Sequence, residues 1–507
     1  MRGRQRVADA QPRFDGGLNT VSDPSVVSET QVREARNLRM TEYGALTKRS
    51  GVAPDPAIAG QPLPSAVQGG FCWRRDNGTV QYLVVAQGIL YVNGVAQSGS
   101  ANLATSGYVN FAQFRDGAND VVYIADGGRI NKWNGTTLSV DVGTGPSVRF
   151  IKVHNRRLWS CGCGTAPDSI FYSGRDDGDS LGDAGAGGGQ IIVRTFGDEV
   201  VVALASVGSS LLIFHRRGVS RLTGFGQDDV TISPEGISGE AGVICPYGLI
   251  ETDDLVFFVT DRGVYAANES AVAPVGTPQS PDPLWPLIAE LPASDYDKVR
   301  GTMARQSQEL LFFVPGEGVY AFHTVLRAWT GPWDGPFAEC TDLWQAVGLT
   351  AEPYVQMGTR FGDVLEVRTP PIAPYARDWW SQQDSPSGDA ITWQVRLHRM
   401  FFGDEATYKS FRWAYLTMRA RAGTSVRVDW QGDAGSSSYT VQASGDGTWD
   451  SSLIWTIARR WGRLGSRNYR IPMGNGGYYA DFTLSSSDDG DFLLSRMQCE
   501  AFAMGRR

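Results

Sequence analysis

Short apolar strands separated by glycine-containing turns recur through the middle of the chain. In each unit an apolar strand is followed by a turn and a second strand that begins with glycine, and six of these second strands start at Gly88, Gly128, Gly218, Gly263, Gly318 and Gly362. The intervals between them are 40, 90, 45, 55 and 44 residues, and a weaker member, Asp168–Gly174, lies inside the longest interval. The pattern therefore has a period of about 45 residues.

A period of ~40–50 residues with several short strands per unit is typical of a β-propeller. A single blade cannot bury both of its faces, but blades packed around an axis cover one another and leave only short edges. We expect residues 58–370 to form six or seven blades. Two stacked β-sandwiches would also contain hairpins turned by glycine, and this pattern does not distinguish them.

The last part of the chain, residues 371–507, has a different pattern. It begins after a stiff break, Thr369-Pro-Pro-Ile-Ala-Pro, and six segments then alternate apolar and polar positions with period two. No helix-sized pattern interrupts them, so we predict a β-sandwich of six or more strands. The predicted strands lie within Ile391–Met400, Lys409–Arg421, Thr424–Trp430, Ser466–Met473, Gly477–Leu484 and Asp491–Met504.

The first 57 residues are expected to form an arm that wraps over a surface. Ser28 and Gln31 have the spacing of a capping box, and Val32 and Ala35 begin a weak apolar stripe, which together predict a short helix of two to three turns. The extended segment Ala45–Val52 follows this helix, and we predict that it supplies a strand that closes the propeller ring.

Composition supports an all-β protein of about three domains and shows an uneven charge. The 507 residues include 61 glycines and 55 aromatic residues, 15 of them tryptophan. Of the net charge of −8, residues 1–50 carry +3 (9 basic, 6 acidic) and residues 381–507 carry +2 (15 basic, 13 acidic). The remaining −13 lies in the middle of the chain, which is the opposite of a protein that clamps nucleic acid.

The six cysteines are scattered, and the chain starts without the pattern of a signal peptide, so we expect reduced thiols and synthesis in a cytoplasm. The longest apolar runs, such as Leu310–Val314, have the length of a strand, and no membrane span is expected.

Two short motifs invite a catalytic interpretation, and their context argues against it. Gly178-Asp-Ser-Leu-Gly182 matches both G-x-S-x-G and the Gly-Asp-Ser-Leu string of one esterase class, but flexible glycine-rich sequence surrounds it where a nucleophile elbow needs a strand and a helix. Ser444-Gly-Asp-Gly-Thr-Trp449 is similar to the Asp-box of sialidase-like propellers, but it occurs once, is one residue short and lies outside the repeats. We interpret both as turns.

The remaining polar groups give no convincing metal or phosphate site. The acidic clusters at 176–183 and 488–491 have oxygen ligands suited to Ca²⁺ but no recognised loop spacing. Cys161-Gly-Cys163 has no partner pair, and the glycines at 185–189 are not followed by Gly-Lys-Ser/Thr. The four histidines, His154, His215, His323 and His398, are isolated. We therefore predict no catalytic, cofactor-binding or metal-binding residues.

The order of several motifs resembles one family. Phe14-Asp-Gly-Gly-Leu-Asn19, then Ser28–Asn37, then Glu42–Gly51 are similar to the N-terminus of the tail nozzle family of tailed phages, which includes tail tubular protein B and the packaged-DNA stabilization proteins of short-tailed phages. Arg157-Leu-Trp-Ser and Ser210–Gly224 resemble blade sequences of that family. The resemblance covers roughly 350 residues, and no single motif decides it.

The resemblance implies a structural virion protein of the tail that is made in the host cytoplasm and needs no cofactor. Six copies would form a tube below the portal and its adaptor ring, next to tail fibre, spike or needle proteins, and would retain packaged double-stranded DNA and conduct it during ejection. The acidic middle segment suits a wall that does not grip phosphate, although acidic loops also simply keep a large protein soluble. As interface residues of the arm we predict Phe14, Leu18, Val32, Ala35 and Leu46.

Two other functions remain open from the sequence. A propeller glycosidase or lyase acting on surface polysaccharide would show repeated Asp-boxes or a set of carboxylates on inner strands. A monomeric propeller that binds peptides would lack the phage-like arm. A ring of six and a monomer differ sixfold in mass, which separates the tube from the peptide-binding scaffold.

Overall fold

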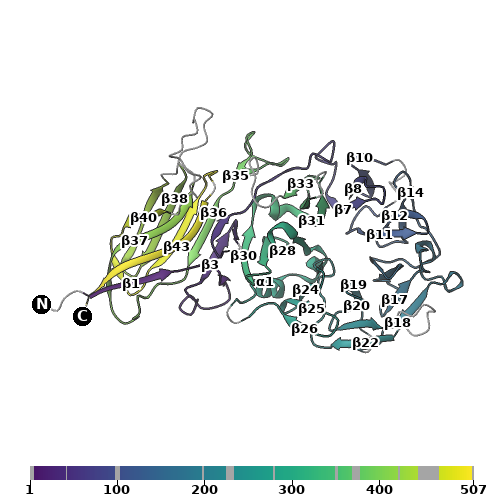
Figure 1. Cartoon of the computed structure of the whole chain (residues 1–507), viewed down its shortest axis with the longest axis horizontal. Helices are drawn as coiled ribbons and strands as arrows, with labels where there is room; N and C mark the ends of the chain where they lie inside the picture. Colours follow the sequence, from purple (N-terminus) through teal and green to yellow (C-terminus); the bar gives the residue numbers. More distant parts are fainter. Residues whose placement is uncertain are drawn as a thin grey trace, which may run out of the picture.

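The glycine-led strands of the repeat become the third strands of propeller blades in the computed structural model of the chain (Figure 1). The structure describes residues 5–41, 43–97, 103–196, 199–223, 233–277, 280–348, 352–367, 377–420, 423–443, 467–490 and 492–504. Within these ranges the fold is all-β, and its α-helix is α1 (Leu284–Glu290). The predicted all-β propeller is confirmed.

Six of the blades are separate four-stranded antiparallel sheets. Five of them use consecutive strands: β7 (Val67–Arg74), β8 (Val80–Ala86), β9 (Ile89–Val92), β10 (Val95–Ala96); β11 (Asn110–Asp116), β12 (Asn119–Ala125), β13 (Asn131–Trp133), β14 (Leu138–Ser139); β15 (Phe150–His154), β16 (Arg157–Cys161), β17 (Ser169–Tyr172), β18 (Gly189–Ile192); β19 (Val201–Val207), β20 (Ser210–His215), β21 (Val219–Thr223), β22 (Ser233–Ser238); β23 (Ile250–Glu251), β24 (Val256–Thr260), β25 (Gly263–Ala267), β26 (Val272–Pro274).

The sixth separate sheet contains the strand that closes the ring. It consists of β31 (Cys340–Val347), β32 (Pro353–Thr359), β33 (Val364–Val367) and, from the start of the chain, β6 (Val52–Pro54). Val52 pairs with Val367, and Pro54 pairs with Leu365. The prediction of a closing strand at Ala45–Val52 was therefore right only at its end, because the residues before Val52 pair elsewhere.

A seventh four-stranded unit lies between the β23–β26 blade and the closing blade. It comprises β27 (Arg300–Ala304), β28 (Glu309–Val314), β29 (Gly318–His323) and β30 (Ala328–Trp333). Only glycine fits the start of β29, because Gly318 has φ 108° and a Cβ there would meet the Trp333 carbonyl oxygen at 2.3 Å. The unit belongs to a ten-stranded sheet that continues out of the ring.

That ten-stranded sheet, which we call the bridging sheet, joins the propeller to a sandwich (Figure 1). After β30 it continues through β3 (Gln31–Arg36), which also pairs with β2 (Gly17–Leu18), and then β36 (Trp393–Leu397), β42 (Asp481–Ser486), β38 (Ser425–Gly432) and β39 (Gly435–Gln442). Opposite these strands lies the second sheet of the sandwich, here named the C-terminal sheet: β1 (Gln5–Gln11), β4 (Leu38–Met40), β5 (Leu46–Lys48), β37 (Lys409–Ala420), β40 (Arg467–Pro472), β41 (Gly476–Gly477) and β43 (Phe492–Ala503).

Alternating apolar side chains explain the sandwich. The inward residues of β37 and β43 pack with Trp393, Val395 and Phe482 of the bridging sheet in one continuous core. All six strands predicted from the period-two pattern are present, and their ends lie within four residues of the expected ones. The short pair β34 (Arg377–Asp378) and β35 (Asp389–Ala390) lies between the two parts of the fold.

The helix predicted near the N-terminus is wrong, because residues 31–36 form strand β3. The hydrogen bond of the capping box is nevertheless present: the Ser28 N–H donates to Gln31 Oε1 at 3.0 Å. The Gln31 N–H also donates to the Ser28 carbonyl at 2.9 Å, and this tight turn leads into a strand. Ala35 pairs with Gly331 on one side and Val395 on the other, and this pairing on both edges of the strand outweighs a helix of two to three turns, which is marginal in water.

The described residues up to Pro54 are therefore not a separate arm. Their strands are distributed over the C-terminal sheet, the bridging sheet and the closing blade. In Figure 1 the purple start of the chain runs beside the yellow end in the sandwich and then crosses to the ring. The N-terminal segment fastens the two parts of the molecule to each other.

Candidate functional site

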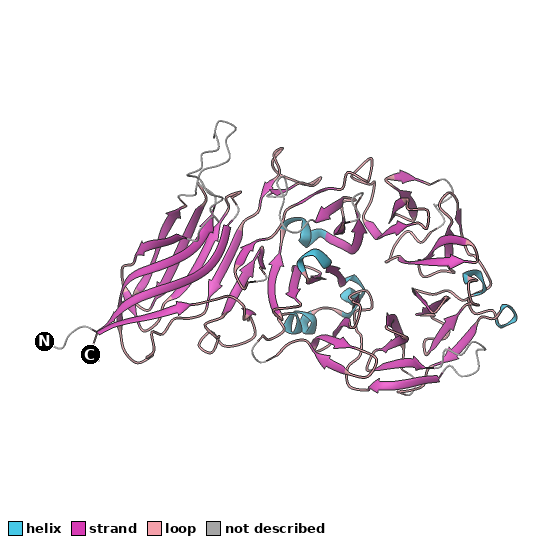
Figure 2. Ribbon diagram, in the orientation of Figure 1, coloured by secondary structure: helices cyan, strands magenta, loops and turns pink. Residues whose placement is uncertain are grey.

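The axis of the propeller is the first place to look for a site, and side chains from distant blades meet there. The rings of Tyr108, which precedes β11, and Tyr247, which precedes β23, lie 4.1 Å apart. The Arg300 guanidinium, on β27, lies over both rings, 4.2 Å and 5.1 Å from their centroids. Figure 2 shows the blades arranged around a central opening. The contacts of Tyr108 with Tyr247 and Arg300 join the β11–β14 blade to β23 and β27, whose units are not its neighbours along the chain.

A buried carboxylate from the closing blade completes this axial cluster. Asp342 is 1% exposed, accepts a hydrogen bond from the Gly70 N–H of β7 at 3.0 Å, and lies 3.6 Å from Arg300 Nε. Burial raises the pKa of Asp342 to about 6, against the attraction of the Arg300 guanidinium, which lowers it. The cluster thus ties the inner strands of several blades together by cation–π contacts, an ion pair and a hydrogen bond.

The raised pKa of Asp342 predicts a specific pH dependence. Because the folded-state pKa lies above the ordinary value of 3.8, the folded state binds this proton more tightly than the unfolded chain does. Its contribution to stability is fully present below about pH 4 and is lost as the pH rises through about 6. We expect the difference in unfolding free energy, wild type minus Asp342→Asn, to fall by on the order of 2–3 kcal/mol between pH 4 and pH 7 in urea unfolding. A flat or rising difference would contradict this assignment.

The Gly-Asp-Ser-Leu motif serves as a structural loop. Ser180 is 5% exposed, its Oγ donates to the Asp177 carbonyl at 2.8 Å, and it accepts a hydrogen bond from the Gly174 N–H at 2.8 Å. Asp179 accepts hydrogen bonds from the Tyr123 hydroxyl at 2.6 Å and from Lys132 Nζ at 2.8 Å. The serine hydroxyl is occupied by backbone groups of its own loop.

Replacing Ser180 by alanine is expected to destabilise the fold. The rate at which the protein hydrolyses an ester substrate is expected to stay the same as in wild type. The variant leaves the buried Gly174 N–H without its acceptor, which costs about 1–3 kcal/mol. Urea unfolding measures this loss, and hydrolysis of p-nitrophenyl acetate measures the activity. Ser106→Ala, at an exposed position, is the matched control and should change neither quantity. Loss of esterase activity in S180A alone would restore the catalytic interpretation.

The histidines hold structural hydrogen bonds in separate parts of the fold. His154 Nδ1 contacts Ser206 Oγ at 2.7 Å, His215 Nε2 contacts Ser220 Oγ at 2.9 Å, and His398 Nδ1 contacts Gln11 Oε1 at 2.6 Å. Burial lowers the pKa of His215 to about 4, so this ring is neutral at pH 7.

The cysteines and acidic clusters are also accounted for in the described part of the chain. All six thiols are free, and burial raises the pKa of both Cys161 and Cys245. Asp488 accepts hydrogen bonds from the Ser425 N–H and hydroxyl. No group of three or more His, Cys, Asp or Glu among the described residues is arranged to hold a metal ion. The Asp-box-like segment at 444–449 lies outside the described residues.

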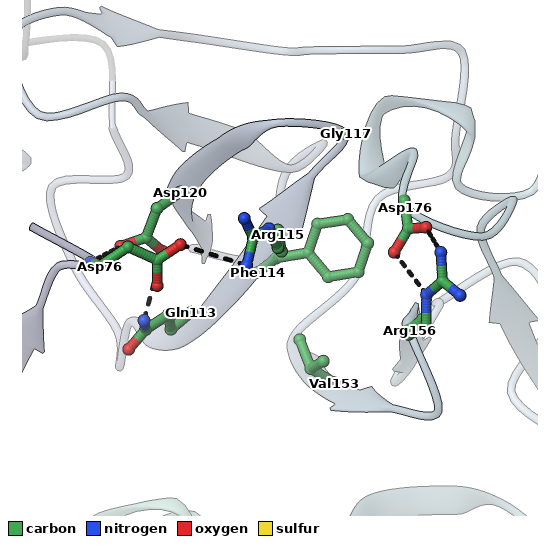
Figure 3. Close-up of a pocket in the computed structure, with 9 residues that line it drawn as sticks. All are labelled: Asp76, Gln113, Phe114, Arg115, Gly117, Asp120, Val153, Arg156 and Asp176. Carbon is green, nitrogen blue, oxygen red and sulfur yellow. Dashed lines mark hydrogen bonds and ion pairs between the residues drawn. The ribbon is translucent and has the colours of Figure 1, made fainter.

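One surface depression of about 660 Å³ lies at the turns of three neighbouring blades (Figure 3). On one side Asp76 faces Arg115 at 3.4 Å, and Asp120 accepts from Gln113 at 3.2 Å. On the other side Asp176 pairs with Arg156, whose Nε lies 2.9 Å from Oδ1. Both arginines of the depression are paired with a carboxylate of the same surface, and Asp120 accepts hydrogen bonds from the Gln113 amide and the Asp76 N–H.

The five residues predicted as interface residues of the arm lie inside the chain. Phe14, Val32, Ala35 and Leu46 are fully buried and Leu18 is 1% exposed. All belong to the core shared by the sandwich and the blades next to it. The contacts that the structure gives them join the N-terminal segment to the rest of the same chain, because hydrophobic strand residues bury against the nearest available sheets.

Comparisons with known proteins identify no family for this chain. No protein-family model matches the sequence, and no curated protein matches it. Among solved structures, "Crystal structure of BBS1N in complex with ARL6DN, soaked with lead" has 11% identity and a TM-score of 0.41 over 64% of this chain and 98% of that chain. The extracellular domain of the putative hybrid two-component system BT4673 from B. thetaiotaomicron has 10% identity and a TM-score of 0.41, over 72% of this chain and 43% of that chain.

In the described residues, no helix has both the length and the apolar character needed to cross a membrane.

Proposed function

We propose that this chain is a structural wall subunit of a phage tail nozzle. Six copies form a tube below the portal and its adaptor ring, contact fibre, spike or needle proteins, and retain and then conduct double-stranded DNA. The proposal starts from the order of N-terminal motifs in residues 14–51.

The observation that supports it most is how this same N-terminal segment is used. Its strands extend both sheets of the sandwich and complete the last blade, and β3 lies between β30 of the propeller and β36 of the sandwich. The hydrophobic core is continuous across the junction. A wall that withstands the passage of DNA has to resist hinge motion between its parts, and shared sheets and a shared core provide that resistance.

The axial cluster adds a constraint on the path of DNA. Tyr108, Tyr247 and Arg300 meet across the centre of the ring, so a duplex has no route through a single propeller. DNA would instead pass through a bore surrounded by several copies. The middle segment brings −13 per chain, which repels phosphate wherever it faces that bore.

Cryo-electron microscopy of purified virion tails tests the proposal. We expect six copies of the two-part outline in Figure 1 around a bore wide enough for duplex DNA, directly below the adaptor ring. Absence of the chain from the virion, or its presence only as an appendage away from the axis, would contradict the proposal.

A further inference from the structure

The outward face of the C-terminal sheet carries an unusual set of charges. Five arginines lie on this face against a single acidic residue, Glu500, and the described part of the face has no lysine. We name these five the arginine face: Arg6, Arg412, Arg419, Arg470 and Arg496. The cross-strand register places four of them on the same side, and Arg412, at a bulge of β37, lies over the ring of Phe502 on that side. All five are exposed, on a chain whose net charge is −8.

Aromatic side chains lie between these arginines on the two central strands. Trp413 and Tyr415 lie on β37, and Phe502 lies on β43. The Arg470 guanidinium carbon lies 3.4 Å from the centroid of Trp413, and that of Arg412 lies 5.2 Å from Phe502. Stacking restricts these long side chains before any partner arrives, so less conformational entropy is lost on binding.

This composition matches the centre of a protein–protein interface. Such centres are enriched in arginine and aromatic residues and depleted of lysine and acids, and their energetic hot spots are most often Trp, Tyr and Arg. A surface that only keeps a protein in solution mixes both signs of charge and uses lysine freely. The partner has to present an acidic surface.

The chain itself contains such a surface on the propeller. In the β23–β26 blade, the turns at 252–255 and 268–271 carry Asp253, Asp254 and Glu269 and no basic residue. Asp253 is 89% exposed, and its Oδ1 lies 3.9 Å from Arg305 Nη2. The turns that line the surface depression differ in composition, because they carry arginines of their own: Arg115 faces Asp76 and Arg156 pairs with Asp176.

We propose that the arginine face binds the acidic turns of the β23–β26 blade of a second copy of this chain. The two surfaces are different, so the contact is head-to-tail, and contacts of this kind form rings when the rotation between copies closes. The inference rests on the proposed function and deepens it, because it names the surfaces that hold neighbouring copies together.

Sedimentation velocity of the full chain over a range of protein and salt concentrations tests the contact. We compare wild type with Arg412→Glu/Arg470→Glu and with Asp253→Arg/Asp254→Arg, because like charges brought together oppose docking. Each double variant is expected to weaken self-association on the order of 100-fold, and wild-type association is expected to weaken as salt rises. Arg216→Glu/Arg217→Glu replaces two exposed propeller arginines with the same change of charge as the Arg412/Arg470 variant; it is the matched control for that variant and should associate as wild type does. Thermal unfolding of each variant verifies that it folds.

The inference is overturned if wild type is a monomer throughout, or if either of the first two variants associates like the control. A parallel titration with a labelled DNA duplex tests nucleic acid as the partner of the arginine face. Binding of the duplex by wild type that R412E/R470E abolishes would assign the arginine face to nucleic acid instead of a second copy. The location of the chain in the tail is measured separately on virions, so failure of this contact leaves the proposed function standing. Absence of the chain from the virion would contradict the proposed function but would not change the self-association measured here.

Discussion

Replacing Arg49 by methionine is expected to remove about 3–5 kcal/mol of unfolding free energy, because it leaves a buried carboxylate without its partner. Arg49 is 1% exposed, and its Nη1 and Nη2 bind Asp378 Oδ1 and Oδ2 at 2.9 Å and 2.6 Å. Its Nε also donates to Asn37 at 2.8 Å, and its guanidinium lies 4.7 Å from the Phe337 ring. Urea unfolding followed by tryptophan fluorescence measures the loss.

Two further variants make that result specific. Arg13→Met removes an arginine that is 72% exposed and 3.7 Å from Asp15, and we expect it to cost under about 1 kcal/mol. Arg49→Met combined with Asp378→Leu removes both buried charges and should recover part of the lost stability. Equal stability of the Arg49 and Arg13 variants would show that the buried pair does not hold the N-terminal segment in place.

Phe14→Ala is expected to destabilise the isolated chain by about 3–5 kcal/mol, since it opens a cavity in the shared core. The side chain is fully buried, so this effect does not depend on any second copy. Tyr43→Ala, at a position that is 90% exposed, is the control and should leave the midpoint of urea unfolding unchanged. If Phe14→Ala instead weakened only self-association, the residue would belong to a subunit interface, as the sequence had suggested.

The fold was predictable where one local rule repeats. A turn, a glycine and an apolar strand recur in six of the units and a weaker form without the leading glycine in one, and the third strands β9, β13, β17, β21, β25, β29 and β33 all lie where the pattern placed them. The sandwich strands followed in the same way from period-two alternation, because each has one buried face.

The N-terminal segment was not predictable in this way, because its structure depends on partners far away in the sequence. Val32 and Ala35 fit a weak helical stripe as well as a strand, and only the neighbours β30 and β36, about 300 residues or more further on, decide between them. The same long-range pairing explains why apolar residues of this segment looked available for another subunit: their true partners are in the chain itself.

The arginine face and the axial cluster could not be predicted from the sequence for a related reason. Nothing in the spacing of Arg6, Arg412, Arg470 and Arg496 places them on one face, because four separate strands bring them together. The axial cluster is similar, with members from before β11, before β23 and on β27 and β31. In both cases, knowledge of the sheet register would have been needed first.

The pairing of β1 with β43 and of β6 with β33 has a consequence for biosynthesis. Residues 5–11 leave the ribosome long before residues 497–503, with which they pair, and residues 52–54 wait for residues 365–367. During translation these early strands expose unpaired backbone edges, which are prone to aggregate. The C-terminal sheet and the propeller ring can therefore be completed only after β43 and β33 have been made. A chain released before β43 is translated would have β1 still unpaired.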